Sequence, residues 1–152
     1  MKRNENIVPL SRDHHNGLLF SWKIRQGIKK NVEKERLSKY VHYFWKDHLE
    51  KHFEEEETIL FNKVRHELCE KAYAEHTQIK HLIEEIAKAD VPFEKYALLA
   101  DILEQHIRFE ERTLFPFLEK TLEPQQLSEV GKMLGPLHES VNEDTYPDEF
   151  WL

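Results

Sequence analysis

The residues best suited to chemistry in this sequence are two His-Glu pairs, each separated by four positions. His52 precedes Glu56, and His106 precedes Glu110. Residues four apart on an α-helix stand on one face, one turn apart, so both side chains of a pair can reach one point. Imidazole and carboxylate together bind iron and similar divalent metals, and helical bundles that hold two irons present inward Glu and His at such spacings. The pairs therefore predict metal binding inside a helical bundle.

The two pairs belong to an internal repeat. Residues 47–61 read DHLEKHFEEEETILF and residues 101–115 read DILEQHIRFEERTLF, and eight of the fifteen positions are identical at an offset of 54. Two charged helices could share composition without a common role, but the identities include both His-Glu pairs. Two other pairs with the same spacing begin at His66 and His81 and lie outside the repeat. We expect those two to be exposed to solvent.

Histidines elsewhere are further candidate ligands. His76 shares a helix face with Ile79 and Ile83, so we expect it to face the core. Near the N-terminus His14 and His15 are adjacent, and the apolar residues of that helix favour His14 while leaving His15 open.

Three more histidines are less informative. His48 precedes His52 by one turn, and it is either a further ligand or a buried hydrogen-bonding residue. His42 and His138 follow no such pattern, and we expect both at the surface.

Hydrophobic periodicity predicts four long helices that carry these residues. Ser11 is the expected N-cap of the first, and the polar run 29–36 connects it to the second. Pro92 breaks the chain before the fourth, which we expect to kink near Pro116. The expected ranges are about Arg12 to Gly27, Leu37 to Arg65, Glu70 to Ala89 and Phe93 to Lys120.

These elements predict an all-α fold, an antiparallel four-helix bundle. A short fifth helix is expected to begin at Pro124 and to end before Gly135-Pro136. Residues 1–141 would form the bundle domain, with a core of about 10–122, and residues 142–152 an irregular acidic and aromatic tail. The tail either lies across the bundle or stays mobile. We favour Tyr146, Phe150 and Trp151 covering the bundle end over docking a partner.

Composition restricts the class of function. The 152 residues include 29 acidic and 22 basic side chains, for a formal net charge of −7, which disfavours binding to nucleic-acid phosphates or anionic membranes. Cys69 is the only cysteine, which excludes an internal disulfide and favours a reducing compartment. No stretch approaches the ~20 apolar residues of a membrane span, and the N-terminus lacks the apolar part of a signal peptide. We therefore expect a cytoplasmic protein without nucleic-acid or membrane partners.

In combination these motifs resemble the hemerythrin-like (HHE cation-binding) domains. The matching pieces are the opening LSRDHH, the HFEEEETILF block, the Glu-His-x-x-Ile of the third helix and the HIRFEERTLFPFLE block, spread over about residues 10–120. The resemblance implies a four-helix bundle that holds two non-heme irons. Carboxylates and an oxo or hydroxo group would bridge the irons, with histidine ligands at the outside.

Carried over by position, the resemblance also implies a set of ligands. It makes Glu56 and Glu110 the bridging carboxylates. Six protein ligands leave vacant positions on two irons, where O2, NO, peroxide or water could bind. The implied ligands are His14 (or His15), His52, Glu56, His76, His106 and Glu110. Side chains one turn further along, Leu60, Phe61, Leu114 and Phe115, would keep the pocket dry.

The chain departs from the oxygen carriers of this family at two places. The carriers have a His-x-x-x-His pair on the third helix, where the second position here is Lys80. They have His-x-x-x-x-Asp on the fourth helix, where this chain has His106 followed by Glu110 and Glu111. One iron therefore loses a nitrogen ligand, which disfavours reversible oxygen carriage and favours members that respond to iron, oxygen or nitric oxide. Without the N-terminal cysteine segment of the di-iron repair members, a complete iron–sulfur repair function is not expected.

Three classes of function follow. We favour a di-iron protein that binds or senses O2, NO or iron and is not an enzyme. The second class is a di-iron enzyme that reacts with peroxide or oxidises ferrous iron at the same residues. The third is a metal-free helical interaction module. Manganese or zinc could replace iron, and the oligomeric state and any protein partner stay open. Because histidine ligands must be neutral, metal affinity should fall below about pH 6.

Overall fold

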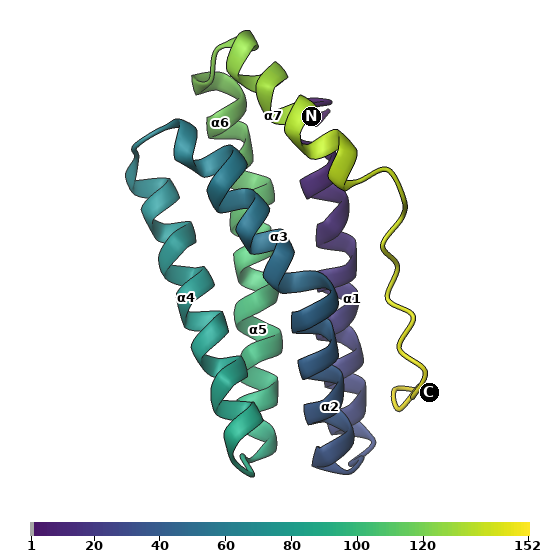
Figure 1. The fold of residues 1–152 in the computed structure, drawn as a ribbon. Helices are drawn as coiled ribbons and strands as arrows, with labels where there is room; N and C mark the ends of the chain where they lie inside the picture. Colours follow the sequence, from purple (N-terminus) through teal and green to yellow (C-terminus); the bar gives the residue numbers. More distant parts are fainter. Residues whose placement is uncertain (1) are drawn as a thin grey trace.

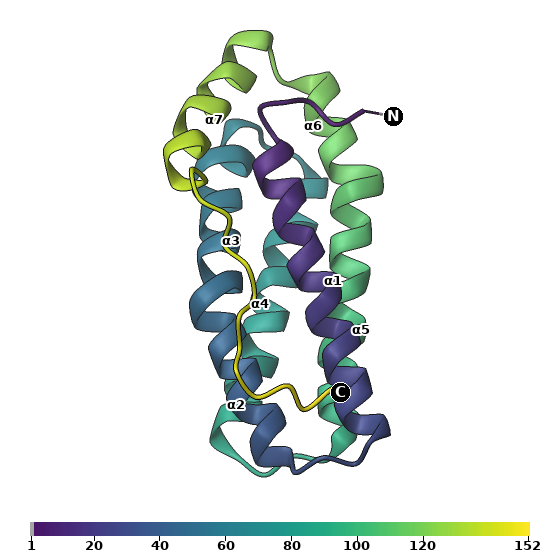
Figure 2. The ribbon, with the colours of Figure 1, turned by 90° about the vertical axis from the view of Figure 1, so that its right-hand side faces the viewer.

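The computed structural model describes residues 2–152, which form an antiparallel bundle of long helical segments (Figures 1 and 2). In the described part of the chain these are α1 (Val8–Lys29), then α2 (Lys34–Phe44), η1 (Trp45–Leu49), α3 (Glu50–Glu55), η2 (Glu56–Leu60) and η3 (Phe61–Lys63) in one run, then α4 (Glu67–Lys88), then α5 (Phe93–Phe109), η4 (Glu110–Leu114) and α6 (Phe115–Thr121), and finally α7 (Pro124–Leu137). No strand occurs among residues 2–152, and the all-α prediction is confirmed. Within the same range, no helix combines the length and apolar character that crossing a membrane requires.

Two apolar clusters fill the bundle, with a layer of buried histidine and glutamate between them. On α1, Leu10 belongs to one cluster and Phe20 to the other, with buried His14 between them. On α4, Ala72 and Ile79 flank His76 in the same way. The apolar core therefore holds the polar layer from both ends of the bundle.

Wide π-helical turns interrupt the second and fourth long segments at that layer. The turn η2 begins at Glu56, and the turn η4 begins at Glu110. Such turns are rare and occur frequently at functional sites. The kink expected near Pro116 stays a prediction: the turn η4 ends directly before α6, where Pro116 occupies the first turn and the helix continues.

The predicted start of the first helix was wrong. Helix α1 begins at Val8, and its N-cap, Ile7, makes no side-chain hydrogen bond. Pro9 fits the first turn, where its missing N–H costs nothing. The Ser11 hydroxyl caps no helix and instead donates to a carboxylate oxygen of Glu111 at 2.8 Å.

The predicted end of the fifth helix was also wrong. Helix α7 continues through Gly135 and Pro136 to Leu137. Both residues are exposed. Proline has no backbone N–H to donate to the carbonyl group one turn earlier, and at this exposed end of the helix water can hydrogen-bond to that carbonyl group instead. The extra turn carries His138 back towards the bundle.

Helices α1 and α5 approach each other closely beside the polar layer. A Cβ atom on Gly17 would lie only 2.6 Å from Ile107 Cδ1. Because glycine allows this approach, α1 presents His14 deep inside the bundle.

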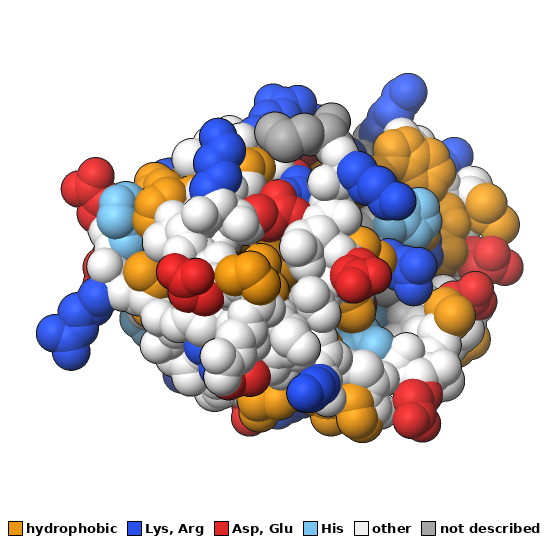
Figure 3. All heavy atoms as spheres, turned by 90° about the horizontal axis from the view of Figure 1, so that it is seen from above, with side chains coloured by type: hydrophobic (Ala, Val, Ile, Leu, Met, Phe, Trp, Pro, Cys, Tyr) orange, Lys and Arg blue, Asp and Glu red, His pale blue; other side chains and the backbone are white. Residues whose placement is uncertain are grey.

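The C-terminal tail is irregular and runs back along α1 and α2 (Figure 2). The Tyr40 hydroxyl donates to Asp144, and Lys23 Nζ lies 3.1 Å from the same carboxylate and 3.9 Å from the centre of the Trp151 ring. Phe150 is 2% exposed and packs on Tyr40. The aromatic residues thus cover the side of the bundle near the α1–α2 connection. At the opposite end, charged side chains of both signs are interspersed with apolar ones (Figure 3).

Replacing Phe150 by alanine should lower the free energy of unfolding by about 3 kcal/mol, because the change removes a buried ring from the core. The control Val141→Ala, at a tail residue that is 84% exposed, should change it by less than ~0.5 kcal/mol. Urea denaturation measures both. Equal stability of the two variants would mean that the tail adds no packing energy.

Candidate metal centre

Most of the candidate ligands predicted from the sequence come together in the polar layer. His15 does not, because it lies on the exposed side of α1. Glu56 and Glu110 have no exposed surface, and the histidines beside them are buried. The residues brought together are His14 of α1, His52 of α3, Glu56 of η2, His76 of α4, His106 of α5 and Glu110 of η4.

The first histidine pair, His14 and His52, lies on one side of the two glutamates. His14 Nε2 is 2.8 Å from Glu110 Oε1 and 3.7 Å from Glu56 Oε2. His52 Nε2 is 3.2 Å from the same Glu56 Oε2. These four residues offer one ligand atom each, and the atoms all lie within 4.8 Å of one another.

The second histidine pair, His76 and His106, lies on the other side. His76 Nε2 is 3.0 Å from Glu56 Oε1 and 3.6 Å from Glu110 Oε2, and His106 Nε2 is 3.1 Å from Glu110 Oε2. This pair forms a second group of ligand atoms with the same two glutamates. Each carboxylate therefore directs one oxygen towards each histidine pair.

Most of these close approaches are not hydrogen bonds. Within residues 2–152 the buried atoms without a hydrogen-bond partner include the Nε2 atoms of His52, His76 and His106, both carboxylate oxygens of Glu56 and Oε2 of Glu110. Buried polar atoms are normally hydrogen-bonded. Ligands at about 2.1 Å from one octahedral metal ion lie about 3 Å from each other, which matches the N···O distances of 3.0–3.2 Å at His52, His76 and His106. The donor set fits one metal ion beside each histidine pair.

Two of the imidazoles each contact a further carboxylate through Nδ1, on the side of the ring that faces away from Glu56 and Glu110. His52 Nδ1 lies 3.0 Å from Asp13 Oδ2, and His106 Nδ1 lies 2.6 Å from Glu75 Oε1. A bond at Nδ1 leaves Nε2 free for a metal ion and fixes the orientation of the ring. Sequence reasoning missed these supports, although an acidic residue directly before His14 and before His76 was a visible signal.

The remaining two imidazoles are held in the same way. His14 Nδ1 is 2.7 Å from Glu111 Oε2, and His76 Nδ1 is 2.6 Å from Glu57 Oε2. Glu57 and Glu111 occupy identical positions of the sequence repeat, so the repeat already contained this signal. The supports relate the two halves of the centre by an approximate two-fold symmetry.

The buried carboxylates raise the pKa values of the histidines. Burial alone would lower them, but the charge of Glu56 raises the pKa of His52 to about 9. The neighbouring carboxylates of Glu110, Glu56 and Glu57 raise the pKa of His76 to about 11. Burial would raise the pKa of Glu110, yet the charge of His106 and the neighbouring hydrogen bonds hold it well below its usual value. Without metal, the centre therefore favours charged imidazoles beside charged carboxylates.

Three other histidines, His48, His42 and His81, lie outside the centre, in surroundings that the sequence analysis predicted or left open. His48 is buried, with Nε2 at 3.3 Å from the Tyr43 hydroxyl, and burial lowers its pKa. It belongs to neither group of ligand atoms. His42 and His81 are exposed, as expected.

Two predicted surface histidines are half-buried instead. His66 is the N-cap of α4, and its Nδ1 accepts a hydrogen bond from the backbone N–H of Leu68. His138 lies against α3, with Nε2 at 2.6 Å from Glu55 Oε1. The extra turn of α7 places His138 there. The sequence analysis did not predict this turn, because it ended the helix before Gly135-Pro136.

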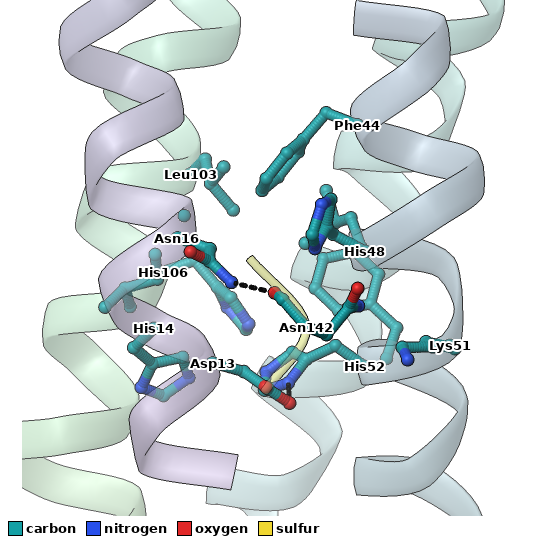
Figure 4. A pocket seen from close by; sticks show the side chains of 14 residues that line it. Asp13, His14, Asn16, Phe44, His48, Lys51, His52, Leu103, His106 and Asn142 are labelled. Atoms are coloured by element: carbon teal, nitrogen blue, oxygen red, sulfur yellow. Dashed lines mark hydrogen bonds and ion pairs between the residues drawn. The ribbon is translucent and has the colours of Figure 1, made fainter. Parts of the chain in front are cut away.

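A small, mostly apolar cavity borders the centre (Figure 4). Its volume of about 20 Å³ suits one water-sized molecule. Three of the centre's histidines line its inner side. At its mouth the backbone carbonyl of Asn142 accepts a hydrogen bond from Asn16 Nδ2 at 2.9 Å. The side-chain Nδ2 of Asn142 donates to the backbone carbonyl of Asp47 at 3.0 Å. The tail therefore crosses the entrance.

Apolar side chains enclose the rest of the centre. Phe115 stacks on His14 with ring centroids 5.4 Å apart, and Phe53 stacks on His76 at 3.8 Å. The side chains expected to keep the site dry are all buried: Leu60, Phe61, Leu114 and Phe115.

A family model described as the hemerythrin HHE cation-binding domain matches residues 10–118. The chain belongs to this family. The resemblance drawn from the motifs is thereby confirmed, and binding of a metal cation is supported by the family and by the buried ligand groups together.

One curated relative is named DNA nickase and comes from Nostoc sp. (strain PCC 7120). It is 31% identical over 136 residues, which cover 82% of this chain and 37% of that protein. The chain thus spans little more than a third of the relative's length. No solved structure matches the chain significantly.

Glu57→Gln should weaken metal binding about 10- to 100-fold, because it removes the charged support of His76. The control Glu84→Gln lies on the exposed side of the same helix as His76 and should leave affinity unchanged. Competition with a chelator measures both affinities. Equal affinities for the two variants would contradict a supporting role for Glu57.

The metal-free protein should lose stability as the pH rises. Charged His52 and His76 contribute in full below the ordinary imidazole pKa of about 6.5, and the contribution is lost as the pH passes about 9 and 11. Metal binding releases these protons, so affinity should rise over the same range. Competition between protons and metal ions for the histidines thus extends above the value of about pH 6 that was expected from the sequence. Unfolding measured from pH 6.5 to 9.5 tests this, and metal-free stability that increases with pH would contradict it.

Proposed function

We propose that this protein binds two iron ions in the buried centre, and that the loaded centre binds or senses a small ligand such as O2 or NO. The cytoplasm is the proposed location, which a buried, unpaired Cys69 supports. The observation that carries the proposal is the way each glutamate divides its two oxygens between the two histidine pairs. That division suits two ions that share both carboxylates.

The number of ligands favours a site that accepts a small molecule. Each ion would have two imidazole nitrogens and two shared carboxylate oxygens, which do not fill the six positions of an octahedral ion. Lys80, where the oxygen carriers have a further histidine, is exposed and supplies no ligand. When bound, iron would supply the open positions and a change of oxidation state. The cavity beside the centre admits molecules of the size of water.

The residues around the centre would control what reaches it and in which protonation state. The outer carboxylates orient the imidazoles through Nδ1. Phe53 and Phe115 exclude water from two sides, while Asn142 spans the mouth of the cavity. A dry, oriented site of this kind favours a selective response to a small neutral molecule.

We do not extend DNA nicking to this chain. The match covers 37% of the relative that carries that name, and a net charge of −7 opposes contact with DNA phosphates. Binding and sensing at the metal centre need no nucleic-acid partner.

Anaerobic loading with ferrous iron tests the proposal. After removal of loosely bound ions, we expect two irons per chain and new near-ultraviolet absorption when air is admitted. The His52→Ala/His106→Ala double variant should retain neither, because it removes one imidazole from each half. Reversible loss of O2 would indicate carriage, whereas turnover of peroxide or of ferrous iron would favour the enzyme class.

The control for this experiment is the His42→Ala/His81→Ala double variant. Both of its histidines are exposed, so it should load as the wild type does. Circular dichroism of all three proteins checks that the bundle has formed. Iron content that is the same in the two double variants would contradict the proposed centre.

A further inference from the structure

A second cluster of metal-binding side chains lies just outside the centre, next to the first histidine pair. It consists of Asp13 on α1, Glu55 on α3 and His138 at the end of α7. His138 Nε2 is 2.6 Å from Glu55 Oε1, and His138 Nδ1 is 4.0 Å from Asp13 Oδ1. One ligand atom from each residue lies within 4.8 Å of the other two. Three helices that are separate in the sequence thus bring an imidazole and two carboxylates together, and the imidazole faces the two carboxylates through different ring nitrogens.

The approximate two-fold symmetry of the centre fails at this cluster. In the other half, Glu75 takes the place of Asp13, and Lys71 Nζ lies 2.7 Å from its carboxylate. Neither Asp13 nor Glu55 has a lysine or arginine partner in the described part of the chain, and their ion pairs are with histidines. Glu55 is only 8% exposed. A carboxylate as buried as that of Glu55 is costly when its charged partner is an imidazole and not a fixed cation, and a bound metal ion would offset that cost.

We propose that Asp13, Glu55 and His138 form a third cation site, for a divalent transition-metal ion. One imidazole nitrogen and two carboxylate oxygens are ligands that Zn²⁺, Mn²⁺ and Fe²⁺ accept. The site borders a cleft of about 440 Å³, which Asp13 and His138 help to line, so water can complete the coordination. With three protein ligands and access to water, this site exchanges its ion more readily than the buried centre does.

Asp13 joins the third site to the centre. Its Oδ2 accepts a hydrogen bond from His52 Nδ1 at 3.0 Å, while its Oδ1 faces His138. Figure 4 shows the Asp13 carboxylate directed at the His52 ring. A cation in the third site therefore shares the carboxylate that orients His52, and occupancy of the two sites is coupled.

Calorimetric titration of the iron-loaded protein with Zn²⁺ tests this site. The wild type should take up one further equivalent, and His138→Gln and Glu55→Gln should each lose that uptake. Asp13 is left intact because it also supports His52. Iron content and near-ultraviolet absorption show that the centre stays filled during the titration.

The control His42→Gln removes an exposed histidine and should keep the further equivalent. Equal Zn²⁺ uptake by the wild type and both site variants overturns the proposal. An equal loss in His42→Gln also overturns it, because the ions would then sit on surface histidines. Should the centre hold no iron, titration of the metal-free protein still reports on this site, since uptake that depends on His138 and Glu55 belongs to it alone.

Discussion

Two carboxylates buried in the middle of the bundle impose a requirement that the surrounding residues must meet. Glu56 and Glu110 have no exposed surface, and two like charges placed close together in a poorly polar interior repel each other. Each of the four long helical segments contributes one imidazole to the layer around them. The pKa values of these imidazoles are raised beside the glutamates, which favours charged imidazoles when no metal ion is bound, and neutral imidazoles would serve as ligands to a metal ion.

This requirement accounts for much of the architecture. The apolar clusters lie on both sides of the polar layer and fix the distances between its helices. The π-helical turns begin at the two glutamates, and an outer carboxylate aligns every imidazole. His138 of α7 pairs with Glu55 in one half and Lys71 pairs with Glu75 in the other, so the two sides of a nearly symmetric centre differ in the charges around them.

Local spacing explains why much of the centre could be predicted from the sequence. The His-Glu pairs and the repeat depend on helical periodicity, and the apolar face of the first helix favoured His14, which lies inside, over His15, which is exposed. The choice of which imidazole on another helix an outer carboxylate contacts has no such signature. The pairing of Glu75 with His106 joins residues of α4 and α5, so no spacing in one helix reveals it.

The prediction that His138 lies at the surface was wrong for a similar reason. Gly135-Pro136 predicts a helix stop, but an exposed last turn tolerates a proline, and the added turn changes the surroundings of His138. The end of a helix depends on what it packs against and on which backbone groups water can reach. Periodicity contains neither kind of information.

X-ray diffraction from crystals of the iron-loaded protein, recorded at the iron absorption edge, would show whether two metal ions share the buried glutamates. We expect an anomalous peak beside each histidine pair, with both peaks in contact with Glu56 and Glu110. A single peak at the two carboxylates, or none, would contradict a centre in which two metal ions share them.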